Sequence, residues 1–395
     1  MTTRLYLAPA AAGKTVAILA HARAAGRDLA AILRVVVPTH LQVRAARRRL
    51  ANMGGAIGVR VLTFDRLYAE ILNAAGEIYV ELSEPVQYRL IRAIVDGLPL
   101  IHNAPLADRP GFIQVLQRLI GELKAARVHP DAFAAAVRAL GNEPRLAELA
   151  QIYAAYQARL QAQGWADRAG LGWLAVETLE QRAADVGRDW SLLAVDGFDS
   201  FTPIQLALLR ALAGRVGELI VTLTGELDDR RPGLAYRRFA RTCAALEAAL
   251  GVQAEPLPTV DAGTAGSTLA PRAPVLAHLT HHLFRPDVAA VDAGAAVALI
   301  EAAGREAEVR AALRWLKQRI VLDGCRPAEV ALLARNVAPY RPFIQQIAAE
   351  FGLPIRLVDG LPLGCVLIWG RRKKDSTTTS FAFRGRRCDN GLNIL

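Results

Sequence analysis

Arg4-Leu-Tyr-Leu-Ala-Pro-Ala-Ala-Ala-Gly-Lys-Thr15 is the segment of this 395-residue chain from which its architecture can be worked out. An apolar strand leads into a loop of small residues, and a helix is predicted to begin at Gly13-Lys14-Thr15. Loops of this shape bind phosphate through backbone N–H groups and a helix N-terminus, with lysine on the β and γ phosphates and threonine on Mg²⁺. We therefore predict that Gly13, Lys14 and Thr15 bind ATP, with Thr15 also holding its Mg²⁺.

The loop departs from the pattern G-x-x-x-x-G-K-[ST] at its first position, where Ala8 replaces glycine. Ala11 also stands where such loops often have glycine, and a Cβ disfavours a positive φ. Two interpretations follow from these alanines. The loop is either a nucleotide site of altered strength or a mark of ancestry that no longer binds nucleotide.

Strand patterns alternate with helical patterns on both sides of this loop, which predicts a parallel sheet with crossover helices. The expected fold class is α/β, a P-loop NTPase (RecA-like) architecture of parallel sheets with an all-helical insertion. Strands are predicted at 5–7, 32–38, 59–63, 191–195 and 219–223. Helices are predicted at 15–25, 41–50, 64–72 and 203–212.

The domain organisation follows from changes in these patterns. Apolar residues at helical spacing and few β-branched runs predict a helical insertion at 80–185, inside a first domain made of 1–79 and 186–251. A Pro-, Gly- and Thr-rich stretch predicts a linker and connecting segment at 252–295. A second RecA-like domain begins at 296–364. Its strands are predicted at 296–300, 330–333 and 355–358, and its helices at 305–320 and 340–351.

Residues 365–395 show neither the helical nor the strand period. We interpret them as a non-native end produced by frameshift or truncation, with a disordered basic tail that grips nucleic acid as the alternative. The formal net charge of the chain is +11, but the run Arg371-Arg-Lys-Lys374 contributes part of it. Charge alone therefore does not establish DNA binding, although it fits a nucleic-acid partner.

We expect no transmembrane helix in this chain. Hydrophobic residues make up 53% of the chain, yet no apolar run is long enough to cross a bilayer. The N-terminus carries no secretory cleavage pattern, so we expect a cytoplasmic protein. The four cysteines are far apart and form no C-x-x-C pair, which predicts scattered reduced thiols.

A second chemical motif is predicted where the strand Leu193-Ala-Val195 ends in Asp196. A P-loop enzyme places an acid on Mg²⁺ in this way, and an ordinary Asp-Gly turn is the alternative. The segment resembles motif II of the UvrD-like superfamily 1 helicases, V-D-E-F-Q-D-T-N-x-x-Q, with Val195, Asp196, Phe198 and Gln205 in register. Gly197 replaces the glutamate that activates the attacking water, which glycine cannot do.

The form D-G-F-x-x-F-T-P-x-Q is similar to a subfamily, the AddB (RexB-like) subunit of bacterial ATP-dependent helicase–nucleases. The order and spacing of further segments over 1–364 carry the resemblance. They are Val35-Val-Val-Pro-Thr39, Val61-Leu-Thr-Phe-Asp-Arg-Leu67, Glu301-Ala-Ala-Gly-Arg-Glu-Ala-Glu-Val309 with Gly324, Ala331-Leu-Leu-Ala-Arg335, Leu353-Pro-Ile355 and Leu361-Pro-Leu363.

The resemblance implies roles for particular residues. Asp196 would hold Mg²⁺ with Thr15, and Gln205 would join the nucleotide site. Thr63, Phe64 and Arg66 fall where superfamily 1 proteins contact single-stranded DNA. Arg335 ends a predicted strand, and two roles are open for it. It either faces nucleotide across a domain cleft or has a packing or surface role.

The resemblance also implies a function, a DNA-binding and helicase-like subunit of a helicase–nuclease complex in double-strand break repair and recombination. Its partners would be DNA, single-stranded or as a duplex end, and an AddA-like helicase–nuclease subunit. Relatives of this kind are about three times as long and end in a nuclease domain, often with an iron–sulfur cluster, neither of which is expected here. Without the glutamate at Gly197 we expect an inactive motor. The alternatives are an active translocase, with Asp199 as base, and a P-loop nucleotide enzyme unrelated to DNA.

Overall fold

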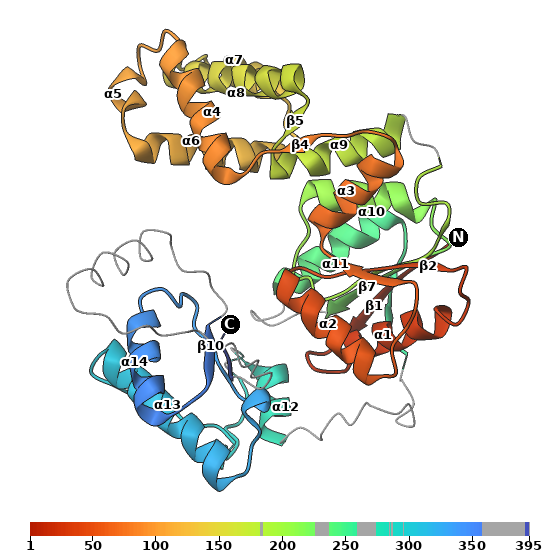
Figure 1. Cartoon of the computed structure of the whole chain (residues 1–395), viewed down its shortest axis with the longest axis vertical. Coiled ribbons are helices and arrows are strands. Elements are labelled where there is room, and N and C mark those ends of the chain that lie inside the picture. Colours follow the sequence, from red (N-terminus) through yellow and green to blue (C-terminus); the bar gives the residue numbers. More distant parts are fainter. Residues whose placement is uncertain are drawn as a thin grey trace, which may run out of the picture. The chain divides into compact units, whose positions relative to one another are not determined.

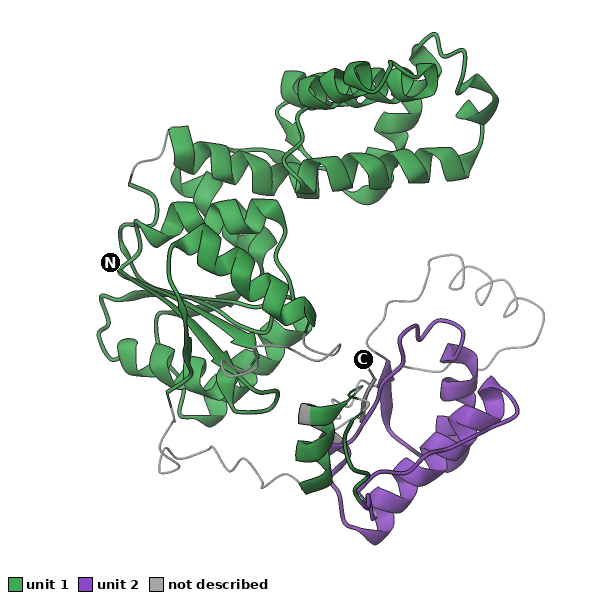
Figure 2. Cartoon of the chain, turned by 180° about the vertical axis from the view of Figure 1, so that it is seen from behind, with its two compact units in different colours: residues 1–291 green, residues 292–395 purple. Residues whose placement is uncertain are grey.

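The computed structural model describes residues 1–181, 185–225, 237–258, 274–283, 285, 287–294, 296–357 and 392–394. The chain divides into two compact units, Met1–Val291 and Asp292–Leu395 (Figure 2). Unit 1 contains the Gly13-Lys14-Thr15 segment and the strand that leads to Asp196, and unit 2 contains Arg335.

A six-stranded sheet forms the centre of unit 1, in the order β3-β2-β6-β7-β1-β8 (Figure 1). Each neighbouring pair of strands runs parallel. This confirms the predicted α/β class and its parallel sheet. The strands are β1 (Thr2–Ala8), β2 (Ile32–Val36), β3 (Val59–Leu62), β6 (Trp190–Val195), β7 (Glu218–Thr224) and β8 (Ala254–Pro256).

Both faces of this sheet are buried, which explains why its strands are continuous apolar runs rather than alternating ones. In β1 the side chains of Leu5 and Leu7 join one core, and Tyr6 between them joins the other. The first core lies against α3 (Phe64–Ala74), α9 (Arg168–Gln181), α10 (Pro203–Ala213) and α11 (Arg237–Leu250). The second lies against α1 (Lys14–Ala25) and α2 (His40–Asn52).

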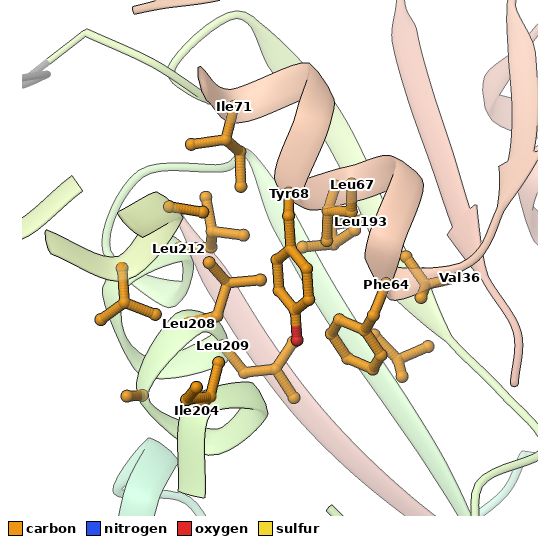
Figure 3. Packing of buried hydrophobic residues seen from close by; sticks show 14 of the residues in the cluster. Val36, Phe64, Leu67, Tyr68, Ile71, Leu193, Ile204, Leu208, Leu209 and Leu212 are labelled. Carbon is orange, nitrogen blue, oxygen red and sulfur yellow. The ribbon is translucent and has the colours of Figure 1, made fainter. Parts of the chain in front are cut away.

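The larger core includes side chains of α3 and α10. Tyr68 of α3 lies beside Ile204 and Leu208 of α10, and Phe64 lies near Val36 at the end of β2 (Figure 3). Leu67, Ile71, Leu193, Leu209 and Leu212 complete the part of the cluster drawn there. These contacts tie the helix that follows β3 to the helix that follows β6.

A second group of helices, which lies between α3 and α9 in the chain, forms its own core. It contains α4 (Glu84–Gly97), α5 (Ala104–Ala107), α6 (Pro110–Ala125), α7 (Pro130–Ala139) and α8 (Pro144–Gln163). Each of these helices has a proline in its first turn, where a missing N–H costs nothing. The segment predicted to be all-helical also contains a strand pair, β4 (Val80–Glu81) with β5 (Trp165–Ala166). Strands of two residues are too short to show a period of two, so no local pattern indicated them.

Unit 2 packs α13 (Arg305–Leu322) against α14 (Arg341–Phe351), around buried Leu313 and Ile347. Its parallel sheet has the order β10-β11-β9, with β9 (Ala331–Leu332), β10 (Ile355–Leu357) and β11 (Leu392–Ile394). A 3₁₀ turn, Pro327–Glu329, precedes β9. Apart from β11, the expected non-native tail at 365–395 lies outside the described residues.

Two predictions about residues 252–300 were wrong. Residues 296–300 form no strand, and Leu299 is 96% exposed. An apolar run becomes a strand only where another strand completes its hydrogen bonds, and here β11 pairs with β9 and β10 instead. The segment 252–258, expected to be linker, contributes β8 to the edge of the main sheet. The helix α12 (Pro274–His282) lies within the same predicted linker.

Candidate nucleotide site

The loop between β1 and α1 closes around its own lysine. Nζ of Lys14 donates hydrogen bonds to the carbonyl oxygens of Ala8 at 3.1 Å and Pro9 at 2.8 Å. Gly13 caps the helix at a φ of 83°, a left-handed conformation that favours glycine. The loop therefore connects the edge of the sheet to the N-terminus of α1. The first backbone N–H groups of a helix have no partners inside the helix.

The two alanines of the loop behave differently. Ala8 belongs to β1 and pairs with Thr224 of β7, so this position does not need the positive φ that glycine would allow. A strand residue is extended, and a Cβ costs nothing there. Ala11, in contrast, does adopt a left-handed φ of 57°. For a residue other than glycine that conformation costs about 1–2 kcal/mol.

Thr15 and Asp196, separated by 181 residues, meet at the edge of the sheet. The hydroxyl of Thr15 donates to Oδ2 of Asp196 at 2.6 Å, and the hydroxyl of Thr222 donates to Oδ1. Asp196 is 3% exposed and follows β6, while Thr222 lies in β7, the strand between β6 and β1. Because parallel strands end at the same edge, the topology itself brings the loop and the acid together.

These residues fit a nucleotide with Mg²⁺. A hydroxyl and a carboxylate in contact are hard oxygen ligands of the kind that Mg²⁺ takes. Lys14 donates to two neutral carbonyl groups, and a charged phosphate is a stronger acceptor than either of them. Thr222 was not predicted, because a threonine in a strand indicates β propensity. The one available sign was a hydroxyl inside the apolar run Leu219–Leu223.

Gly197 has a φ of 84°, so the backbone at the position of the missing glutamate is left-handed. A Cβ there would lie 3.5 Å from Nε2 of Gln42 and from Cδ of Pro38, which is ordinary contact. Conformation rather than space therefore favours glycine. The alternative base, Asp199, forms an ion pair with Arg238 of α11 at 3.0 Å.

The other two predicted nucleotide-binding residues, Gln205 and Arg335, make no contact with Thr15 or Asp196 among the hydrogen bonds and ion pairs of the described residues. Gln205 closes a capping box at the start of α10, where Oε1 accepts from the backbone N–H of Thr202 at 2.9 Å. Arg335 is exposed and follows β9 in the other compact unit. The structure thus joins Gly13, Lys14, Thr15 and Asp196, and gives Gln205 a part in a helix cap.

The predicted DNA residues lie at the start of α3. Thr63 precedes the helix, and its Oγ1 is buried without a hydrogen-bond partner among the described residues. Phe64 is 4% exposed and meets Phe198 edge to face, with ring centroids 5.1 Å apart. Arg66 is exposed. The three residues therefore differ in access, and only the arginine presents its side chain to solvent.

No helix in the parts of the chain that the structure describes combines the length and apolar character needed to cross a membrane.

Comparisons with known proteins place the chain in a family. The family described as ADDB, N-terminal matches residues 5–279. A protein of Moorella thermoacetica, named as a subunit of an ATP-dependent helicase/deoxyribonuclease, is 31% identical over 396 residues, which cover 92% of this chain and 33% of the relative.

Proteins with the same name from Symbiobacterium thermophilum and Pelotomaculum thermopropionicum are 29% and 27% identical. The first match covers 85% of this chain and 30% of the relative, and the second covers 90% and 32%. The chain thus spans about a third of the length of the curated relatives it matches.

Proposed function

The chain belongs to the ADDB N-terminal family, and from that premise we propose that it is the helicase-like part of a subunit of an ATP-dependent helicase–deoxyribonuclease. We assign its six-stranded sheet to the P-loop NTPase, RecA-like class. The observation that carries the proposal is the contact between Thr15 and Asp196, which joins the two motifs at one sheet edge.

The nucleotide of this proposal is ATP with Mg²⁺. Lys14 would bind the phosphates, and the backbone N–H groups at the start of α1 would hold their oxygens. Thr15 and Asp196 would hold the metal. Gln205 and Arg335 stay in the proposal as predicted nucleotide-binding residues.

The motor of this proposal is inactive. Hydrolysis needs a carboxylate that orients and activates water, and Gly197 offers none. Asp199 is a poor substitute because its carboxylate is paired with Arg238. ATP would therefore have a structural or regulatory role.

The partners of this proposal are DNA and an AddA-like helicase–nuclease subunit, and the setting is double-strand break repair and recombination in the cytoplasm. Arg66 is the exposed member of the predicted DNA contacts, with Thr63 and Phe64 shaping the turn beside it. An arginine of this kind neutralises backbone phosphate without reading sequence.

An ATPase and binding experiment tests the proposal. We expect the full chain to bind a fluorescent ATP analogue in the presence of Mg²⁺ and to show negligible ATP turnover with or without single-stranded DNA. Lys14→Ala removes the charge that meets the phosphates, so its affinity for the analogue should fall at least about tenfold. Equilibrium titration and a phosphate-release assay are the measurements.

The matched control is Lys317→Ala, because Lys317 belongs to α13 of unit 2 and bonds the carbonyl oxygen of Phe351. It should bind the analogue as the wild type does. Rapid turnover that Lys14→Ala abolishes would contradict the inactive motor and favour an active translocase. Nucleotide binding without any binding to single-stranded oligonucleotides at low salt would favour an enzyme unrelated to DNA.

A further inference from the structure

The first 64 residues of the chain carry most of its positive charge. They contain nine arginines and one lysine against a single carboxylate, Asp28, and so account for +9 of the formal net charge of +11. No Asp or Glu stands between Asp28 and Asp65, a stretch that includes the whole of α2. The charge is therefore concentrated in β1, β2, β3 and the two helices that connect them.

The helix α2 presents four arginines to solvent. Val43, Ala46 and Leu50 are buried against the sheet, and the arginines lie on the remaining surface of the helix. These exposed residues, which we call the α2 arginine surface, are Arg44, Arg47, Arg48 and Arg49. Since residues three and four apart are neighbours on a helix, the first three of these side chains form one cluster.

No carboxylate neutralises the α2 arginine surface in the part of the chain that the structure describes. Arg47 donates to the carbonyl oxygen of Val61 at 2.9 Å, and its three companions form no ion pair among those residues. Arg34 and Arg60, on the neighbouring strands, both pair with Glu70 at 2.7 Å. Like charges three and four residues apart destabilise a helix, so α2 contains a repulsion that a bound anion would relieve.

The arginines of α13 have a different environment. Arg310 pairs with Glu306 of the same helix and with Glu350 of α14. Arg319 pairs with Asp323, four residues further along the chain. Pairs of this kind cannot form within α2, because that helix contains no acidic residue. Richness in arginine therefore does not by itself explain the unpaired cluster on α2.

The α2 arginine surface is separate from the predicted DNA contacts. The helices α1 and α2 cover one face of the sheet, and α3, which carries Arg66, lies on the other (Figure 1). Arg23 of α1 extends the surface toward the turn that follows α2, since a Cβ at Gly54 would lie 2.9 Å from one of its guanidinium nitrogens. Positive charge thus continues from α2 onto the neighbouring helix.

The composition of these two helices distinguishes between kinds of nucleic acid. Sites for single strands combine positive charge with aromatic rings on which the bases stack. Neither α1 nor α2 contains Phe, Trp or Tyr. A duplex keeps its bases stacked inside and presents its phosphates outward, so arginine side chains alone are sufficient to bind it.

We propose that the α2 arginine surface binds the phosphate backbone of duplex DNA, independently of base sequence. A guanidinium donates two parallel hydrogen bonds to a phosphate, and several of them on one helix face neutralise neighbouring phosphates together. This inference rests on the proposed role of the chain in binding DNA, and it adds the form of DNA and the surface that binds it. It requires neither the nucleotide nor Arg66.

Fluorescence anisotropy of the full chain with a short blunt duplex, at several salt concentrations, tests this surface. Arg44→Gln combined with Arg48→Gln removes two charges and keeps residues that suit a helix. We expect this variant to bind the duplex at least about tenfold more weakly, with a salt slope smaller by about 1.8, the value for two phosphate contacts on B-DNA. Arg44→Lys combined with Arg48→Lys keeps both charges and should retain the slope and most of the affinity.

The matched control is Arg138→Gln combined with Arg159→Gln, which removes the same charge from exposed positions of α7 and α8. It should bind the duplex as the wild type does. Binding of an oligothymidylate should be the same in all of these variants. Unchanged duplex binding by the α2 glutamine variant, an equal loss in the control, or failure of the lysine variant to bind would overturn the proposal.

Two further arms separate this inference from its alternatives. Poly-L-glutamate that displaces the duplex as effectively as unlabelled duplex of equal charge would assign the surface to an acidic protein, and would overturn the proposal. Wild-type binding to oligothymidylate but not to the duplex would remove this inference and leave the proposed function intact. Binding to neither form of DNA would contradict both.

Discussion

Ala11, in the loop between β1 and α1, has an unfavourable backbone conformation. Its φ of 57° is left-handed, and its neighbour Ala12 does not share that conformation. Each of the two side chains is exposed, so neither packs against a core. The conformational cost at Ala11 is consequently a property of the residue itself, and glycine would remove it.

We expect Ala11→Gly to raise the free energy of unfolding by about 0.5–1 kcal/mol, because the released strain exceeds the added chain entropy. Ala12→Gly gains nothing in the folded state and should lower that free energy by up to about 1 kcal/mol. Urea unfolding followed by circular dichroism measures both. If Ala12→Gly stabilised the protein and Ala11→Gly did not, the strain in the loop would not lie at Ala11.

At the scale of elements, α9 is the helix that connects the inserted helices to the sheet, and Gly172 allows its close approach. A Cβ at Gly172 would lie 2.9 Å from Cε2 of Tyr68 and 3.0 Å from Cγ2 of Ile204. Both neighbours are buried, so neither can move away freely. Gly121 of α6 offers a contrast, because no atom lies within 4 Å of the corresponding point.

Gly172→Ala should therefore lower the free energy of unfolding by about 1–3 kcal/mol, since the extra methyl overpacks the α3–α9–α10 contact. The same change at Gly121 adds helix propensity without a clash and should raise it by about 0.5–1 kcal/mol. Chemical unfolding of the two variants beside the wild type gives both values. If the two substitutions had the same sign, close packing at Gly172 would not be the cause.

The turn before α5 depends on a carboxylate of α8. Glu148 accepts backbone N–H groups from Ile101 at 2.7 Å and from His102 and Asn103 at 2.8 Å each, with Nδ2 of Asn103 at 2.9 Å. Burial raises the pKa of Glu148, but these hydrogen bonds outweigh it and lower the pKa from 4.5 to about 2. The ionised form is thus the one that holds the turn.

A lowered pKa stabilises the fold above the ordinary value of 4.5, and that contribution is lost as the pH falls toward about 2. We expect Glu148→Gln to lower the free energy of unfolding by about 2 kcal/mol at neutral pH. The difference from wild type should shrink below pH 4.5. Thermal unfolding across this pH range is the measurement. Glu122→Gln, an exposed change on α6, is the control, and an equal loss in both variants would contradict the role of Glu148.

At the scale of the whole molecule, the DNA proposal depends on Arg66. Arg66→Ala should weaken binding to an oligothymidylate by roughly threefold to tenfold and reduce the salt slope by about 0.7, the value for one phosphate contact on a single strand. Arg138→Ala removes another exposed arginine, on α7, and should bind as wild type does. Fluorescence anisotropy at several salt concentrations checks both, and identical behaviour of the two variants would remove Arg66 from the contact.

Much of unit 1 could be predicted from sequence, because buried parallel strands such as β6 are apolar runs with clear ends. The contact between Thr15 and Asp196 followed from the same patterns. Thr222 and β8 could not be found in this way. A hydroxyl in a strand has no distinctive neighbours, and β8 has three residues, one of them Pro256, at an edge where proline is tolerated.

The prediction at 296–300 failed for a different reason. Val297, Leu299 and Ile300 have the composition of a strand, yet strand formation depends on a partner that composition does not specify. Phe64 similarly belongs to a motif that resembles a DNA contact, while its burial depends on Phe198, more than a hundred residues away. Pairing and packing between distant segments are what the local pattern lacks.

The strand order β3-β2-β6-β7-β1-β8 has a consequence for the growing chain on the ribosome. When the first three strands have emerged, β2 can pair with β3, but β1 has neither of its neighbours. At about 5–20 residues per second, roughly 10–40 seconds pass between Thr15 and its partner Asp196, which follows 181 residues later. During that interval, in which the inserted helices are synthesised, the apolar strand β1 has no strand to pair with. The nascent protein is therefore most exposed to aggregation and to chaperones before β6 and β7 are synthesised and join β1 to β2, after which β8 completes the sheet.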